Sequence, residues 1–370
     1  MTDLERILPL WHELESTGVD SVLATVVGVE GSSYRKPGAR MLLAQDGRRA
    51  GTVSGGCLEA EVARRAWWLT ANGPVVERYS TLDDDGDMPY GSGCGGAVFL
   101  LLERGAMGGS LLAGLEAAFQ ARMPAAIATV LDGPHAGRHV FAHSAEGGDA
   151  RLADLAARAL DTQANFEQTI TLEGMRTRVF AEYCPARPGL WIFGAGDDAK
   201  PLLTLARELG WFVAVMDGRS NLATRERFSS ADDVRVLQFS ALPAGAAEDL
   251  APKPTDAAVV MTHSFEQDSR ILASLLQLAM PPAYIGVLGP QRRTRELLAE
   301  AARLLNLSAT SDRIDRWLAH LHAPTGLDLG ADTPASIALS ILAEAQQVLH
   351  AGSGRALREV RAAKGIAALL

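Results

Sequence analysis

The sequence predicts an α/β protein in which an N-terminal α+β domain, residues 1–184, is followed by a Rossmann-like parallel-sheet domain, residues 189–370. In the first part, short hydrophobic runs are separated by turn residues and by single helical patterns. In the second part, each hydrophobic run is followed by a helical pattern, which favours a parallel sheet. The segment CPARPG at 184–189 contains prolines and a glycine, and it is the best linker between the two parts.

Composition limits the function classes that need to be considered. A chain of 370 residues with 48% hydrophobic and 21% charged residues is typical of a globular protein with two or three domains. The net charge of −9 argues against a general nucleic-acid binder, which needs a basic face. No apolar run approaches the roughly 20 residues of a membrane helix, and the acidic start lacks the basic end of a signal peptide. We therefore expect a cytoplasmic protein without nucleic-acid or membrane partners.

Hydrophobic periodicity and turn residues predict the N-terminal elements. Asp46-Gly47 is a hairpin signal after a hydrophobic run, and Asn72-Gly73-Pro74 ends a helical pattern. The predicted order is a helix at 2–16, strands at 20–29 and 39–44, a short strand ending near 54–57, a helix at 57–70, strands at 75–79 and 97–102, a helix at 108–122, strands near 125–131 and 138–143, a helix at 151–164 and a strand pair at 168–182.

An alternation of hydrophobic runs with helical patterns predicts the C-terminal elements. The predicted order is a strand at 190–193, a helix at 199–209, a strand at 211–216, and strands at 257–262 and 283–288 that each precede a helix. Beyond residue 305 the strand signal stops. Thr333-Pro334 then begins a last amphipathic helix that runs to about 349.

The stretch from Gly28 to Glu61 has the composition of a binding site. Cys57 falls near the start of a predicted helix, where unpaired amides and the helix dipole stabilise a thiolate and can hold an anion. The cations of the preceding loop, including Lys36, would add charge for a phosphate. The candidate ligand contacts are Ser32, Ser33, Arg35, Arg40, Gly55, Gly56 and Cys57.

Each of these assignments has an ordinary alternative. Cys57 could be a small buried thiol, and Glu59 is either a charge at the helix N-terminus, which we favour, or a proton acceptor. Cys94 and Gly95 lie in the mirrored sequence Cys-Gly-Gly, where missing side chains leave sulfur and amides open to a ligand.

Two metal sites of familiar type are disfavoured by the sequence. The three cysteines, which include Cys184, show no zinc-ligand spacing, and we expect reduced thiols. The acidic segment 83–89 resembles half of a calcium loop but lacks the closing Glu of an EF-hand, which favours a solvated loop.

The motif GAGDDA at 194–199 matches G-x-G-x-x-A between a strand and a helix. Gly194 and Gly196 would allow the close approach of a pyrophosphate, and Asp217 lies at about the 20-residue spacing of a ribose-binding acid. Asp197 and Asp198 count against dinucleotide binding, because they satisfy the helix dipole themselves and repel a phosphate. A purely structural Rossmann domain is the alternative.

Two further strand ends would reach the same edge of a parallel sheet, where ligands bind in such folds. His263 follows one strand, and Gly289 follows the next, with Arg292, Arg293 and Arg295 after it. The alternatives are a structural histidine and a solvated arginine face.

Several motifs together resemble those of one family. GSSYRKPGARML at 31–42 followed by TVSGGCLEAEV at 52–62 is similar to the N-terminal signature of the XdhC/CoxI family, whose members are accessory proteins for xanthine dehydrogenase and related molybdenum hydroxylases. The resemblance continues at GCGGAVFLLLE, IFGAGDDAKPLLTLARELGW, VMDGR, MTHSFEQD, YIGVLGPQRRTRELL and LHAPTGLDLGADTPASIALSILAE. The family usually has histidine where this chain has Asp197.

The resemblance implies a carrier of molybdenum cofactor, either molybdopterin or its dinucleotide form. Such a carrier protects the cofactor during sulfuration by a cysteine desulfurase and delivers it to an apo molybdenum hydroxylase of the xanthine dehydrogenase family, and it need not catalyse a reaction itself. Molybdenum favours soft sulfur ligands, so Cys57 is the candidate metal ligand. The resemblance also suggests that two chains contribute to one cofactor site.

Two other functions stay open at the level of sequence. An NAD(P)-dependent oxidoreductase would use the Rossmann part for its cofactor, and a scaffold would only dock partners. The apolar stripe of the last helix has to be buried on the other domain, on its own sheet or on a second chain. We expect a homodimer in which this region helps to join the halves.

Overall fold

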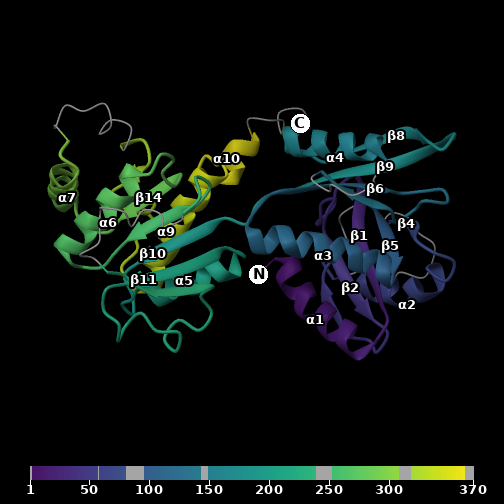
Figure 1. Ribbon diagram of the computed structural model, residues 1–370, viewed down its shortest axis with the longest axis horizontal. Coiled ribbons are helices and arrows are strands. Elements are labelled where there is room, and N and C mark those ends of the chain that lie inside the picture. Colours follow the sequence, from purple (N-terminus) through teal and green to yellow (C-terminus); the bar gives the residue numbers. More distant parts are fainter. Residues whose placement is uncertain are drawn as a thin grey trace. The chain divides into compact units, whose positions relative to one another are not determined.

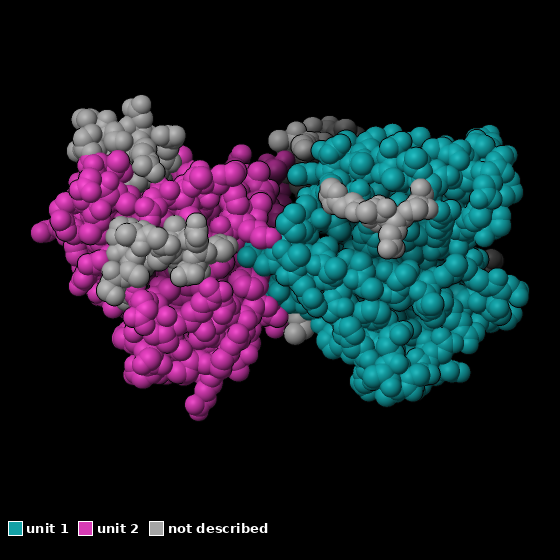
Figure 2. Space-filling view, in the orientation of Figure 1, with its two compact units in different colours: residues 1–187 teal, residues 188–370 magenta. Residues whose placement is uncertain are grey.

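The computed structural model describes residues 2–56, 58–80, 96–142, 149–238, 252–307 and 318–362. The chain divides into two compact units, residues 1–187 and 188–370, which Figure 2 colours teal and magenta. The last strand of the first unit ends at Cys184, and the first strand of the second begins at Gly189. None of the helices in the described part of the chain is long and apolar enough to cross a membrane.

Two antiparallel sheets and four helices form the described part of the N-terminal unit (Figure 1). The five-stranded sheet has the order β3-β2-β1-β5-β4 and the four-stranded sheet the order β7-β6-β9-β8. The strands are β1 Ser21–Glu30, β2 Arg40–Ala44, β3 Arg49–Gly51, β4 Val75–Ser80, β5 Ala97–Arg104, β6 Ala125–Val130, β7 His139–Phe141, β8 Phe166–Leu172 and β9 Met175–Cys184. The helices are α1 Asp3–Thr17, α2 Glu59–Leu69, α3 Ala106–Ala121 and α4 Ala150–Thr162.

Helices cover both faces of the five-stranded sheet. Because side chains alternate along a strand, Val22 and Ala24 of β1 pack with α2, whereas Leu23 packs with α1 and α3. Helix α4 buries Leu152 and Ala156 against the four-stranded sheet. The signature loops therefore extend from strands that are held rigidly by packing on both faces.

The C-terminal unit contains a six-stranded parallel sheet of order β12-β11-β10-β13-β14-β15, the doubly wound Rossmann order. Its strands are β10 Gly189–Phe193, β11 Phe212–Asp217, β12 Asp233–Val236, β13 Ala257–Val260, β14 Tyr284–Val287 and β15 Leu321–His322. Its helices are α5 Ala199–Glu208, α6 Phe265–Gln277, α7 Gln291–Leu304, α9 Pro334–Leu349 and α10 Leu357–Ala362. Helices α5 and α9 share one hydrophobic cluster with the sheet, and α6 and α7 share the other.

The start of this sheet is fixed by a buried carboxylate. Asp256, just before β13, accepts hydrogen bonds from the backbone N–H of Gly189 at 2.8 Å and from the indole N–H of Trp191 at 2.9 Å. Both bonds tie β10 to its neighbouring strand. The predicted fold class, an α+β part followed by a Rossmann-like parallel sheet, is confirmed.

The apolar stripe of α9 is buried inside its own unit. Ile341 is 1% exposed and lies in one cluster with Leu202 of α5 and Tyr284 of β14. Of the three partners that the sequence left open, the structure therefore shows the Rossmann sheet with its helix α5. The stripe is already covered there, which corrects the expectation that it helps to join the halves.

The elements that the sequence analysis missed are short. They are the edge strands β12 and β15 and the helix α10. Strand β12 has the sequence DVRV and is only partly buried, so its hydrophobic signal is weak. Strand β15 has only two residues, which is too short for any periodicity.

Candidate functional site

Segments of the signature that are far apart in the sequence meet at one end of the five-stranded sheet. Strand β1 ends at Glu30, which pairs with Ala97 at the start of the antiparallel strand β5. A Cβ atom on Gly96 would lie 2.3 Å from the backbone oxygen of Ser32 and 2.6 Å from that of Glu30. Only glycine fits there, so Gly96 brings the end of the GCGG segment against the loop that contains Ser32 and Ser33.

The loop between β3 and α2 joins the same cluster. The ring of Tyr34 lies 3.8 Å from the position that a Cβ on Gly55 would take, and Tyr34 itself is 75% exposed. Gly56 has a φ of +111°, a conformation that favours glycine. Gly55 and Gly56 are both exposed. The cluster therefore presents open backbone beside an exposed aromatic ring.

The Glu59 carboxylate holds this loop in place by accepting hydrogen bonds from it. Its Oε1 accepts the backbone N–H of Ser54 at 2.8 Å and that of Val53 at 3.2 Å, and its Oε2 accepts the Ser54 hydroxyl at 2.5 Å. Burial would raise the pKa of Glu59, but the hydrogen bonds from Ser54 outweigh it, so the pKa is lowered. Glu59 is thus a carboxylate that organises backbone, in line with the favoured charge at the helix N-terminus.

The backbone on both sides of Cys57 is bound to one oxygen. The Ser54 hydroxyl oxygen accepts the N–H of Gly56 at 3.1 Å and the N–H of Leu58 at 3.1 Å. Cys57, Cys94 and Gly95, and the acidic segment 83–89, lie outside the described residues. What the structure establishes is that both neighbours of Cys57 are held by the Ser54 and Glu59 pair.

Arg35 is a cation close to this loop. It forms an ion pair with Asp3 of α1, and the Ser33 hydroxyl donates to the backbone oxygen of Arg35 at 2.8 Å. Burial lowers the pKa of Arg35, while the negative charge of Glu59 acts in the opposite direction. Arg35 therefore places positive charge close to the Glu59 loop.

Arg40 does not join the cluster. Its guanidinium forms a buried ion pair with Glu182 of β9, with Nη1 2.9 Å from Oε1, and both side chains are 5% exposed. Burial acts to lower the pKa of Arg40, but Glu182 more than offsets this and the pKa is raised. Cys184 donates to the same carboxylate at 3.2 Å, and burial raises the pKa of its thiol. Arg40 thus links the two sheets of the unit.

In the C-terminal unit, the glycine motif forms the expected turn between β10 and α5. A Cβ on Gly194 would lie 2.5 Å from the backbone oxygen of Met261, so glycine is required by the neighbouring strand. Asp217 at the end of β11 is fully buried and accepts the N–H of Ala195 at 2.8 Å. It also accepts three hydrogen bonds from Arg219, which outweigh the effect of burial and lower its pKa.

The two acids of the motif, Asp197 and Asp198, are both paired with other side chains of the protein. Asp197 forms ion pairs with Lys200 at 2.7 Å and Arg227 at 3.0 Å. Asp198 lies 2.9 Å from Nε2 of His263, which belongs to the loop after β13. A Cβ on Gly196 would lie 2.4 Å from Oδ1 of Asp198. The space beside the second glycine is therefore taken by a carboxylate.

A cavity of about 160 Å³ lies one strand further along this edge, at the ends of β13 and β14. Its lining residues are Met261, His263, Asp268, Leu288, Gly289 and Arg293. The structure thus brings His263 and Gly289 together, as expected from their positions after neighbouring strands.

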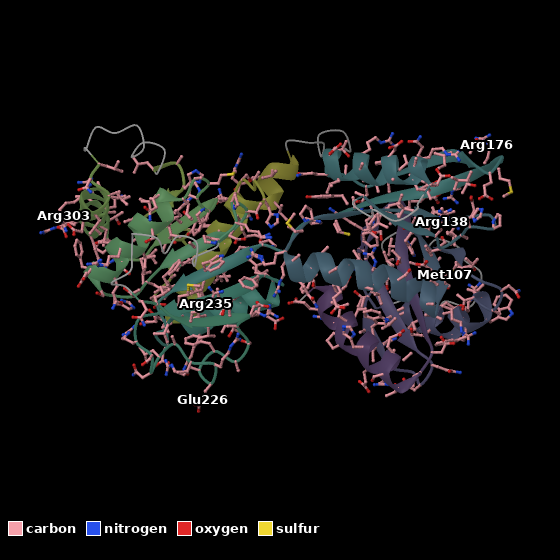
Figure 3. All side chains as sticks on the ribbon, in the orientation of Figure 1. Met107, Arg138, Arg176, Glu226, Arg235 and Arg303 are labelled. Carbon is pink, nitrogen blue, oxygen red and sulfur yellow. The ribbon has the colours of Figure 1, made fainter. Side chains whose placement is uncertain are left out.

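The arginines of α7 divide into an inner and an outer set. Arg293 lines the cavity and is 25% exposed, whereas Arg292 is 91% exposed. Arg303, labelled in Figure 3, is 70% exposed and pairs with Glu300 of the same helix. The solvated-face alternative thus describes Arg292 and Arg295, which are both exposed, but not Arg293.

Sequence reasoning missed several residues that organise these sites. Tyr34 and Ser54 lie within the two N-terminal motifs but were not named as candidates, and Asp3 lies in the predicted first helix; the fold alone reveals their partners. Asp268 had a usable signal, since it is an acid in the first turn of the helix that follows a predicted strand. In the part of the chain that the structure describes, no three His, Cys, Asp or Glu side chains gather as a metal site.

Comparison with known proteins adds family relationships. A family model described as the XdhC Rossmann domain matches residues 190–345, and one described as the XdhC and CoxI family matches residues 14–80. A relative from Bacillus subtilis (strain 168), whose name describes a probable component of xanthine dehydrogenase, is 32% identical over 88% of this chain and 92% of its own length.

Two more similarities are informative. The molybdenum cofactor insertion chaperone PaoD of Escherichia coli (strain K12) is 34% identical over 28% of this chain and 33% of its own length. A crystal structure from Bacillus halodurans, described as that of a xanthine dehydrogenase, has a TM-score of 0.71 and 30% identity, and the match covers 95% of this chain and 96% of that one.

Proposed function

The chain belongs to the XdhC and CoxI family, and we propose that it is an accessory protein that holds molybdenum cofactor for a molybdenum hydroxylase of the xanthine dehydrogenase type. The observation that carries this proposal is the cluster at the end of the five-stranded sheet. There, exposed Gly55 and Gly56 precede Cys57 on a loop that Ser54 and Glu59 hold in place. A soft sulfur next to exposed glycines suits a molybdenum dithiolene, because molybdenum favours sulfur ligands.

Each residue of the cluster has a separate role in this proposal. Cys57 would hold the molybdenum, and the exposed backbone at Gly55 and Gly56 would approach the pterin without steric conflict. Arg35 supplies positive charge for the cofactor's anionic groups. Cys94 and Gly95 directly precede Gly96, which packs against Ser32, and we propose them as further contacts. Arg40 is left out of the set because its ion pair with Glu182 is buried, whereas the pair of Arg35 with Asp3 is partly exposed.

The proposal extends to what happens to the cofactor. The glycines of the cluster are exposed, which suits a ligand that is handed from one protein to another. We propose that the cofactor is protected here while a cysteine desulfurase supplies sulfur, and is then delivered to the apo-hydroxylase. The relative PaoD, named as an insertion chaperone, supports the delivery step. Mass analysis of the bound pterin tests which form is carried, molybdopterin or its dinucleotide form.

We also propose that the protein is a homodimer, the commonest oligomeric state. Light scattering over a range of concentrations tests this directly. A mass of one chain at every concentration would contradict it.

The test of the function is a pair of serine variants. Cys57→Ser keeps the size of the side chain but removes the soft, ionisable sulfur, so molybdenum retained per purified chain should fall about tenfold or more. Cys184→Ser is the matched control, because Cys184 is bound to Glu182 away from the cluster. Metal analysis and pterin fluorescence of the purified proteins measure the result. Equal molybdenum in wild type and Cys57→Ser, at equal thermal stability, would overturn the assignment.

A further inference from the structure

The carboxyl edge of the parallel sheet has two places that a ligand can approach. One is the crevice between β10 and β13, where the strand order reverses and where Rossmann folds bind a dinucleotide. The other is the cavity between the ends of β13 and β14. The two places differ in whether their side chains are already bonded within the protein or still have hydrogen-bond donors for a ligand.

The crevice between β10 and β13 is closed by the protein's own side chains. The Asp217 carboxylate, which would bind a ribose, already accepts the N–H of Ala195 and three hydrogen bonds from Arg219. Asp198 fills the space beside Gly196 and pairs with His263 across the crevice.

The neighbouring cavity is small and has a mixed lining. Its volume of about 160 Å³ is well below the roughly 300–1,000 Å³ of pockets that enclose drug-sized ligands. It is also about five times the ~30 Å³ that a water molecule occupies in the liquid. There is room for one compact polar group with a few attached atoms, for which Met261 and Leu288 provide apolar contact.

Arg293 is held ready to bind that group. Its Nη2 donates to Asp268 at 2.6 Å, and its Nη1 donates to the backbone oxygen of Leu288 at 3.3 Å. Asp268 also accepts the N–H and the hydroxyl of Thr262, at 3.1 and 2.6 Å, so its charge is shared among three donor groups. A guanidinium has five N–H donors, and these two bonds leave capacity for an oxyanion.

His263 lines the same cavity in a strained conformation. Its φ is +64°, in the left-handed region that residues other than glycine rarely adopt. The imidazole is 61% exposed and bonds to Asp198, so it is available to turn toward a ligand. Backbone strain of this kind gathers at ligand-binding positions.

We propose that this cavity binds the phosphate of a small phosphomonoester through Arg293 and His263, and that the adjacent crevice does not take a dinucleotide. A phosphomonoester presents three acceptor oxygens, which can accept hydrogen bonds from the remaining N–H donors of Arg293 and from the imidazole of His263. This inference does not depend on the cofactor assignment to the N-terminal unit. The phosphate has two chemical sources, the phosphate of a molybdopterin-type cofactor or a separate metabolite.

The test titrates inorganic phosphate into the full-length protein in a phosphate-free buffer by calorimetry. Wild type should bind, and Arg293→Ala should bind about 10- to 100-fold more weakly, because a charged hydrogen-bond donor is lost. Arg293→Lys preserves the ion pair with Asp268 but removes the planar fork, and it serves if Arg293→Ala is unstable. His263→Asn retains a residue that tolerates a positive φ while it removes the imidazole, and it should also weaken binding.

Two comparisons make the result specific. Arg292→Ala removes a neighbouring charge that is 91% exposed, and its phosphate affinity should equal that of wild type. NADH fluorescence should show no binding to wild type. Equal phosphate affinity in wild type, Arg293→Ala and Arg293→Lys, or NADH binding to wild type, would overturn the proposal.

Molybdenum content distinguishes the two sources of the phosphate. If Arg293→Lys loses both phosphate affinity and retained molybdenum, the cavity binds the cofactor's own phosphate. If it loses phosphate affinity alone, the cavity binds a separate phosphomonoester. Failure of the cofactor assignment would appear in the Cys57→Ser comparison and leave the phosphate titration unaffected.

Discussion

Charged residues in this protein are paired with partners that lie far away in the sequence. Arg35 and Arg40 are five positions apart in the sequence, and the sequence alone predicts the same role for both. In the structure Arg35 pairs with Asp3 near the signature cluster, whereas Arg40 is buried against Glu182. No local pattern encodes the Glu182 partner, because the pairing is created by the contact between the two sheets.

The Arg40 and Glu182 pair makes a prediction about stability. Arg40→Met leaves a buried, unpaired carboxylate and should lower the free energy of unfolding by about 3–5 kcal/mol. The double variant Arg40→Met with Glu182→Met removes both charges and should recover most of that loss. Urea unfolding measures both. Arg48→Met, which breaks a surface pair with Glu13, is the control and should change stability much less.

Glu59 makes a prediction about pH. Because its pKa is lowered in the folded protein, its hydrogen bonds add stability at pH values above the ordinary glutamate pKa of about 4.3. That contribution is lost as the pH falls through the lowered pKa. Glu59→Gln should therefore be less stable than wild type at pH 7, and the difference should shrink toward pH 3. Urea midpoints at several pH values measure it, and a constant difference across this range would contradict the role of Glu59.

Elements with a strong hydrophobic period are those that the sequence predicts best. The pattern predicts helix α9 from Thr333 to about 349, and the helix runs over Pro334–Leu349, because Thr333 caps it and proline fits its first turn. Strand β12, with the sequence DVRV, is not predicted, because its side chains carry little hydrophobic signal and the strand is formed by its backbone pairing with β11. Periodicity shows that a face is apolar, but only the fold shows what covers it.

The buried face of α9 makes a prediction of its own. Ile341 is 1% exposed, so Ile341→Asp places a carboxylate in the core between α9 and α5 and should destabilise the protein by several kcal/mol, or prevent folding. Leu339→Asp is the matched control on the same helix, because Leu339 is 53% exposed. Thermal unfolding compares them. Equal stability of the two variants would show that the α9 face is not buried as described.

The candidate sites could be predicted in part, because a parallel sheet places its strand ends at one edge while an antiparallel sheet does not. In a parallel sheet, strand ends share one edge, so His263 and Gly289 could be placed together from the sequence. In the antiparallel unit, Gly96 meets Ser32 through the pairing of β1 with β5, and only the register of that pairing brings them together. The chemistry of single loops could therefore be predicted, including the effect of Asp198 on a phosphate, whereas the pairing of Asp198 with His263 and the hydrogen bonds from Arg219 to Asp217 could not.

The division of the chain into two units leads to a prediction about folding. Each unit has hydrophobic clusters of its own, and β9 and β10 are separated only by the segment between Cys184 and Gly189. Residues 1–187 and 188–370, expressed separately, should each unfold cooperatively in urea, because neither loses a strand from its sheets. A fragment of residues 1–142 is the control: it removes β9, the partner along the whole of β6, and should not fold. If neither unit-length fragment folds, the prediction is wrong, and the folding of each unit depends on the other.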